Sequence, residues 1–262
     1  MKHGLNTDEN DSAFTLMELL VVITIIGILA ALLLPVLSQT KKRAQQIQCA
    51  NNVRQLGIAL QAFTIDNNNF PLWIKPHSQA VTWQQNLQQF IFSPKNTNRF
   101  STWIHQGVWK CPAASDNSHW PTNGGDLNFD YGYNVCGIAA WTDTNSFGLG
   151  GHHVWSSSSL PAPPVNESEI MAPSEMIAIG DGFWVNDENI CEGYLLWRSK
   201  QPSDFISSTK DSNARHRGKA NVVFCDGHVE SPTLKFLFED TSDEALSRWN
   251  RDHLPHREKL SP

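Results

Sequence analysis

Residues 13–37 of the 262-residue chain read AFTLMELLVVITIIGILAALLLPVL. The stretch carries no charge between Leu19 and Leu37, and one carboxylate, Glu18, lies near its start. As a helix, the uncharged run would extend about 28 Å at about 1.5 Å per residue, just enough to cross the hydrocarbon core of a bilayer. It is apolar all round, whereas a helix of a globular domain keeps a polar face. The stretch therefore predicts a membrane-spanning helix.

The helical pattern continues beyond the apolar stretch. Across residues 38–65, apolar side chains recur at steps of four, three, four and three, at Cys49, Val53, Leu56, Leu60 and Phe63. Residues 67–69 are asparagines, and they end the pattern together with Pro71. We therefore expect a leader at residues 1–13, one helix over 14–66 with a membrane part at 14–37, and a globular domain over 67–262 that packs on the apolar face of the second half.

Composition restricts the class of protein. The net charge of −6 and the pI of about 5.9 argue against a nucleic-acid partner. The ten tryptophans predict a core rich in aromatic side chains, and the alternative is a surface that stacks on sugars or partner proteins. The five cysteines form no CxxC pair, which disfavours a structural zinc site. Cys111 and Cys136 are the candidate disulfide if the domain lies outside the cytoplasm.

Two later stretches resemble each other. MIAIG at residues 176–180 runs into Asp181-Gly182, and NVVFC at residues 221–225 runs into Asp226-Gly227. Each is an apolar strand followed by Asp-Gly, which favours a tight hairpin turn. We expect a hairpin over residues 220–230 and pairing of the first strand beside it. The fold class is therefore α+β, with an antiparallel sheet packed on the long helix.

Four side chains near these turns could bind a metal. Asp181, His216, Asp226 and His228 offer two carboxylates and two imidazoles, a set that suits a transition metal, while the carboxylates with nearby carbonyls would suit Ca²⁺. The alternative is structural: Asp-Gly is what a tight turn requires, and His216 would hydrogen-bond the turn at Asp226. We found no hydrolase, P-loop, zinc-protease or dinucleotide motif in the sequence, so we expect no enzyme and no firm cofactor.

Glu18 is the residue of the apolar stretch that most needs an explanation. A carboxylate inside a membrane segment costs roughly 2.5–3.5 kcal/mol on insertion scales, and less near an end. If the chain is cut after Ala13, the new amine of Phe14 lies four residues upstream and could pair with Glu18 of a neighbouring copy. The alternative is a carboxylate at headgroup depth that has no role.

These residues resemble the N-terminal signal of type IV pilins and type II secretion pseudopilins. The match comprises Ala13, where glycine is usual, Phe14, Glu18 and Pro35 at the family's spacings. The resemblance implies that a prepilin peptidase cuts between Ala13 and Phe14 and methylates the amine of Phe14. It also implies that the retained helix, which Pro35 kinks, anchors the subunit in the bacterial inner membrane. The helix then packs against other subunits in a filament, and the domain is periplasmic or extracellular.

The C-terminal half carries a second resemblance. His216, nine intervening residues and Asp226-Gly227 resemble the H-X9-DG signature of prepilin-like proteins that are abundant in planctomycete- and verrucomicrobia-type bacteria. This places the signature on the hairpin region 216–230. We therefore expect a structural subunit of a pseudopilin-like filament, with a link to type II secretion. The alternative is a membrane-anchored module that binds polysaccharide or protein and does not polymerise.

Overall fold

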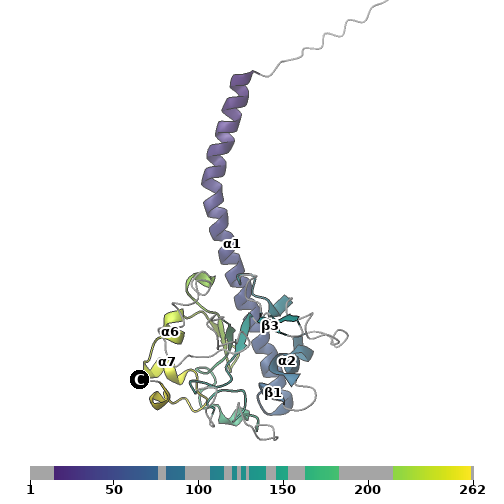
Figure 1. Ribbon diagram of the computed structural model, residues 1–262, viewed down its shortest axis with the longest axis vertical. Helices are drawn as coiled ribbons and strands as arrows, with labels where there is room; N and C mark the ends of the chain where they lie inside the picture. The colour runs from purple at the N-terminus through teal and green to yellow at the C-terminus, as the bar shows by residue number, and fades with distance from the viewer. Residues whose placement is uncertain are drawn as a thin grey trace, which may run out of the picture. The chain divides into compact units, whose positions relative to one another are not determined.

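A computed structural model (Figure 1) describes residues 15–75, 81–91, 107–114, 120–122, 125–127, 130–139, 146–152, 163–182 and 215–260. The chain divides into two compact units, Met1–Arg43 and Ala44–Pro262. Each unit is described by itself below.

Helix α1 (Leu16–Asn67), with 52 residues, is the longest helix in the described part of the chain (Figure 1). It continues through Pro35 without ending there. In the first unit the hydroxyls of Thr24 and Thr40 donate to backbone carbonyls one turn earlier, to Leu20 at 2.7 Å and to Val36 at 2.9 Å. Among the described residues, α1 is the one helix long and apolar enough to cross a membrane.

The second unit contains a four-stranded antiparallel sheet. Its order is β5 (Tyr131–Tyr133), β6 (Ile177–Asp181), β7 (Val222–Phe224) and β8 (Val229–Glu230). The expected hairpin is confirmed, because β7 and β8 pair across the Asp226-Gly227 turn, and β6 pairs with β7 as expected. The predicted α+β class, with a long helix and an antiparallel sheet, is therefore confirmed.

Both faces of the sheet are covered. Val223 and Ile179 pair across β7 and β6 and lie in the core cluster that includes the buried face of α1. Phe224 and Ile177 also pair, and they lie in a second cluster with the C-terminal helices α6 (Leu234–Phe238) and α7 (Asp243–Ser247). A bulge between Ile177 and Ile179 accompanies this change of face, as bulges do when they re-aim side chains.

The remaining elements are short. Two further hairpins are formed by β1 (Ile74–Lys75) with β2 (Val81–Thr82), and by β3 (Trp120–Thr122) with β4 (Gly125–Leu127). The others are α2 (Trp83–Ile91) and the 3-10 turns η2 (Gly107–Trp109), η3 (Glu167–Glu169), η4 (Arg215–Arg217) and η5 (Arg257–Lys259).

The predicted helical periodicity of the domain half of α1 is confirmed. The five residues expected on its apolar face are all buried: Cys49, Val53, Leu56, Leu60 and Phe63. Trp83, Trp109 and Trp249 are also buried, so these described tryptophans contribute to an aromatic-rich core and not to an exposed stacking surface.

The predicted cysteine pairing is wrong. The disulfide joins Cys49 of α1 to Cys111, with Cα atoms 5.2 Å apart and a sequence separation of 62. Cys136 is buried in the same core cluster but is not the partner of Cys111. The physical reason is that the buried face of α1 brings Cys49 against the segment after η2, a long-range contact that sequence spacing does not reveal.

Candidate functional site

The N-terminal half of α1 offers an extended apolar surface. Every large apolar side chain from Leu16 to Leu37 is between 44% and 87% exposed. An exposed apolar surface of this length requires a covering of lipid or of other apolar helices, because monomeric soluble proteins rarely leave such a patch in water. This part of the helix is therefore long and apolar enough to cross a membrane.

Glu18 caps the start of that helix. Its Oε2 accepts hydrogen bonds from the backbone N–H of Thr15 at 2.9 Å and from the Thr15 hydroxyl at 2.8 Å. The Thr15 hydroxyl in turn accepts from the N–H of Glu18 at 3.2 Å. This reciprocal pattern is a capping box, and it gives the carboxylate a partner within its own chain. The predicted cleavage residues Ala13 and Phe14 lie outside the described residues.

The four candidate metal ligands separate into two pairs. His216 Nε2 lies 3.3 Å from Asp181 Oδ2, and both side chains are fully buried. His228 Nδ1 lies 2.6 Å from Asp226 Oδ1 in a half-exposed turn. Among the described residues, the group of three or more potential ligands that comes close together is Cys49, Cys111 and His216, without Asp226 or His228. The expectation that His216 hydrogen-bonds the Asp226 turn is therefore replaced by contacts with Asp181 and Cys111.

Asp181 has a different role from the one its Asp-Gly sequence suggests. It is the last residue of β6 and is fully buried, whereas the prediction placed it in a tight turn. Its Oδ2 accepts from the backbone N–H and from the side-chain amide of Asn221, at 2.6 and 3.0 Å. Asp181 thus ties the end of β6 to the start of β7, and it faces His216.

Further buried charges surround this pair. Asp130 Oδ2 accepts from the N–H of Cys111 at 2.8 Å, and Arg215 Nη1 donates to the carbonyl of Gly182 at 2.8 Å. Burial raises the pKa of Asp130 to about 6, although the nearby positive charge of Arg215 and the N–H of Cys111 oppose the rise. The interior around His216 is therefore polar and charged, in contrast to the apolar clusters on either side of the sheet.

The Asp226-Gly227 turn packs on α1. Gly227 has φ of +90°, and a Cβ at this position would lie 2.7 Å from Nε2 of Gln61 on α1. Glycine is therefore favoured here by the backbone conformation, and a Cβ would in addition displace the end of the Gln61 side chain. A cavity of about 430 Å³ adjoins the turn, lined by Gln61, Asp226 and apolar residues of α1.

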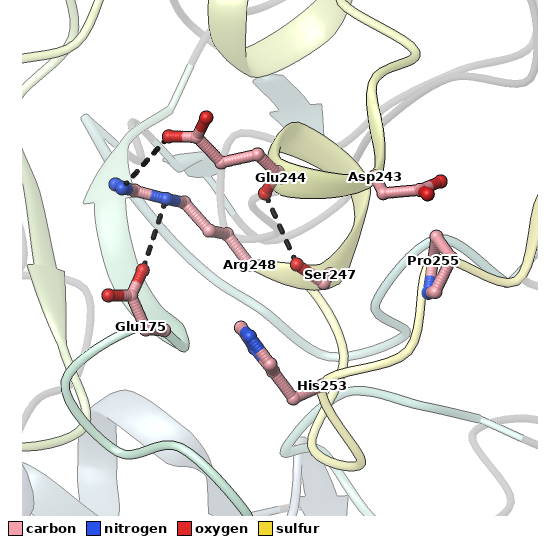
Figure 2. A pocket seen from close by; sticks show the side chains of 7 residues that line it. All are labelled: Glu175, Asp243, Glu244, Ser247, Arg248, His253 and Pro255. Carbon is pink, nitrogen blue, oxygen red and sulfur yellow. Dashed lines mark hydrogen bonds and ion pairs between the residues drawn. The ribbon is translucent and has the colours of Figure 1, made fainter.

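A second cavity, of about 500 Å³, lies beside α7 (Figure 2). Its centre is Arg248, whose guanidinium points between Glu175 and Glu244. The same guanidinium also pairs with Glu230 of β8 at 3.0 Å. These ion pairs connect the segment before β6, the edge strand β8 and α7. We therefore interpret the cluster as one that stabilises the fold.

Sequence reasoning missed two contributors to these sites. The first is Thr15, which forms with Glu18 the pattern T-x-x-E, a recognisable capping box. The second is Cys49. Cys49 lay on the correctly predicted buried face of α1, and this was the available signal that it faces the domain interior. Its particular partner required the folded chain.

Comparisons with known proteins agree with the character of the N-terminal helix. Residues 10–34 match the family model described as the prokaryotic N-terminal methylation motif. The chain is 43% identical over 60 residues to type II secretion system core protein G of Aeromonas hydrophila, covering 23% of this chain and 42% of that protein. For the protein of that name from Pseudomonas aeruginosa, the identity is 28% over 99 residues, covering 38% of this chain and 63% of that protein.

The similarity is partial in length. With the Klebsiella michiganensis core protein G, the identity is 34% over 86 residues, covering 33% of this chain and 54% of that protein. The chain thus spans about half the length of the curated relatives it matches. No solved structure matches the chain. The chain therefore carries an N-terminal methylation motif at the start of α1, and part of it is similar to type II secretion system core protein G.

Proposed function

We propose that this protein is a non-enzymatic structural subunit of a pseudopilin-like filament linked to type II secretion. The observation that carries the proposal is the coincidence of the methylation motif at residues 10–34 with a helix whose apolar side chains are exposed from Leu16 to Leu37. The similarity to type II secretion system core protein G favours this assembly role over a tethered binding module.

Processing precedes assembly in this proposal. A prepilin peptidase cuts between Ala13 and Phe14, and the new amine of Phe14 is methylated. The retained helix holds the subunit in the inner membrane, with the unit Ala44–Pro262 on the periplasmic or extracellular side. The length and apolar character of α1 support this arrangement, because the helix can span a bilayer by itself.

Glu18 has a defined task during assembly. In the single subunit its carboxylate accepts two hydrogen bonds from Thr15, which lowers the cost of holding the carboxylate at the membrane without a counter-charge. In the filament, the carboxylate meets the N-terminal amine of a neighbouring subunit. The exchange of a local hydrogen bond for a charge pair in an apolar surrounding favours the correct axial register, because other registers would leave both charges unpaired.

The test compares Glu18→Ala with the matched variant Thr24→Ala. Thr24 is a polar residue of the same helix whose hydroxyl is satisfied by its own backbone. Both variants should insert in the membrane fraction, but Glu18→Ala should be lost from sheared filaments while Thr24→Ala is retained. Normal incorporation of Glu18→Ala would contradict the charge-pairing mechanism. Mass spectrometry of the membrane-extracted protein should find a chain that starts at methylated Phe14, and a chain that keeps residues 1–13 would contradict the processing step.

A further inference from the structure

Four buried side chains from distant parts of the chain lie near one another in the interior of the second unit. Cys49 comes from α1, Cys111 from the segment after η2, Asp181 from the end of β6 and His216 from η4. Each is at most 5% exposed. The two sulfurs and a ring nitrogen of His216 lie within 4.8 Å of one another. His216 Nε2 is 3.3 Å from Cys111 Sγ and 3.3 Å from Asp181 Oδ2.

The polar groups in this cluster are incompletely satisfied by the protein. Among the described residues, Asp181 Oδ1 and His216 Nδ1 are buried and have no hydrogen-bond partner. A buried polar atom without a partner costs roughly 1–3 kcal/mol, so such atoms call for an explanation. Here both belong to the His216–Asp181 pair, and Nε2 of His216 lies 3.3 Å from Cys111 Sγ.

We propose that, when the Cys49–Cys111 disulfide is reduced, Cys49, Cys111, His216 and Asp181 bind a zinc ion. Thiolate, imidazole and carboxylate are the donors that Zn²⁺ takes in tetrahedral sites. With Zn–S of about 2.3 Å and Zn–N or Zn–O of about 2.0 Å, neighbouring ligand atoms lie roughly 3.3–3.8 Å apart. The distances from His216 Nε2 to Cys111 Sγ and to Asp181 Oδ2, both 3.3 Å, already approach this geometry. The two sulfurs have to separate, and the Asp181 carboxylate has to move closer to them, because it lies outside the group of three ligands within 4.8 Å.

The disulfide and the zinc-bound form exclude each other, because the same two sulfurs cannot be bonded to each other and bind the metal as thiolates. A dithiol reductant passes two electrons and two protons to the disulfide: the Cys49–Cys111 bond breaks, each sulfur gains a proton, and the reductant closes its own S–S bond. Zn²⁺ then displaces both thiol protons to solvent and binds the thiolates. The ion with two thiolates and one carboxylate carries one net negative charge, and the buried guanidinium of Arg215, 3% exposed, provides a nearby positive charge.

Either state links the same two segments. The disulfide joins α1 to the segment around Cys111. The zinc ion would join these two segments to the end of β6 and to η4 as well. The absence of a CxxC spacing does not oppose such a site, because its ligands come from four segments and the fold, not the sequence, brings them together. The inference does not depend on filament assembly, since it concerns the interior of the second unit alone.

The test uses the full-length protein in detergent, reduced with a phosphine that does not compete for the metal and then dialysed against ZnCl2. The expected result is one zinc retained per reduced chain, a rise in Tm on zinc addition, and no stoichiometric zinc in the oxidised chain. His216→Asn should weaken zinc affinity by about 10-fold or more. Asparagine tolerates the left-handed backbone of this position, where φ is 51°. His228→Asn is the matched control, because His228 lies outside the cluster, and it should bind as the wild type does.

Cobalt provides a measurement that needs no variant. Co²⁺ in the reduced wild-type chain should give thiolate-to-metal charge-transfer absorption and the visible bands of a tetrahedral ion, both displaced by one equivalent of zinc. Reduced protein that retains no zinc, or cobalt bound without thiolate absorption, would overturn the proposal. Equal zinc affinity of His216→Asn and the wild type, or equal binding by oxidised and reduced chains, would overturn it as well.

Discussion

Gly57 determines how closely α1 approaches the sheet. A Cβ built at this position would lie 2.4 Å from Cγ2 of Val223 on β7. Carbon atoms in contact are about 3.5–4.0 Å apart, so Gly57→Ala requires a displacement of more than about 1 Å. Val223 has little freedom to yield, because it is fully buried, pairs with Ile179 and Val229 on both sides, and is β-branched.

The expected change is a net loss of stability. Overpacking of this kind costs about 1–3 kcal/mol, while replacing a helical glycine by alanine returns about 1 kcal/mol through helix propensity. We therefore expect Gly57→Ala to lower the free energy of unfolding by about 0–2 kcal/mol, the balance of those two terms. Val223→Ala alone should cost roughly 2 kcal/mol through lost burial and the cavity that it leaves.

The double variant is the decisive measurement. In Gly57→Ala with Val223→Ala, the new methyl group enters the space that the valine leaves, so the combined loss should be smaller than the sum by about 1 kcal/mol or more. Urea unfolding of the full-length protein in detergent, followed by tryptophan fluorescence, reports each value. Ile58→Ala is the control: its side chain is 56% exposed, so stability should change little. Strict additivity of the two single changes in the double variant would refute the packing argument.

Two further substitutions test other contacts. Replacing both Cys49 and Cys111 by alanine, with metal excluded by a chelator, should lower the free energy of unfolding. The disulfide spans 62 positions, and the chain-entropy estimate for such a loop is about 4 kcal/mol. Reductant should bring the wild type to a similar urea midpoint and leave the variant unchanged, and a wild type insensitive to reduction would contradict this. Gly227→Ala should destabilise slightly more than Gly218→Ala: φ is positive at both, and at Gly227 the Cβ would also displace the flexible end of the Gln61 side chain. Equal losses of melting temperature would show that the contact is unimportant.

The disulfide and the glycine contact act on the same helix. Cys49 and Gly57 both lie on the buried side of α1, one bonded to the segment after η2 and the other against β7. The part of α1 that belongs to the second unit is therefore held there by a covalent bond and by close packing.

Local sequence patterns determined much of this molecule. The period of apolar residues predicted α1 and its buried face, because each helical turn returns a side chain to the same side. Asp226-Gly227 predicted the β7–β8 hairpin, because the turn chemistry resides in adjacent residues. Glu18 and its spacing predicted the methylation motif, since the motif is contiguous in sequence.

The tertiary structure alone decided the long-range contacts. Asp181 has the same Asp-Gly context as Asp226, yet it ends a buried strand and faces His216, because its neighbours come from β7 and η4. Cys111 pairs with Cys49 and not with Cys136, because the packing of α1 sets which sulfurs meet. Sequence patterns encode conformation over a few residues, whereas the chemistry of a buried side chain depends on whichever distant segment folds against it.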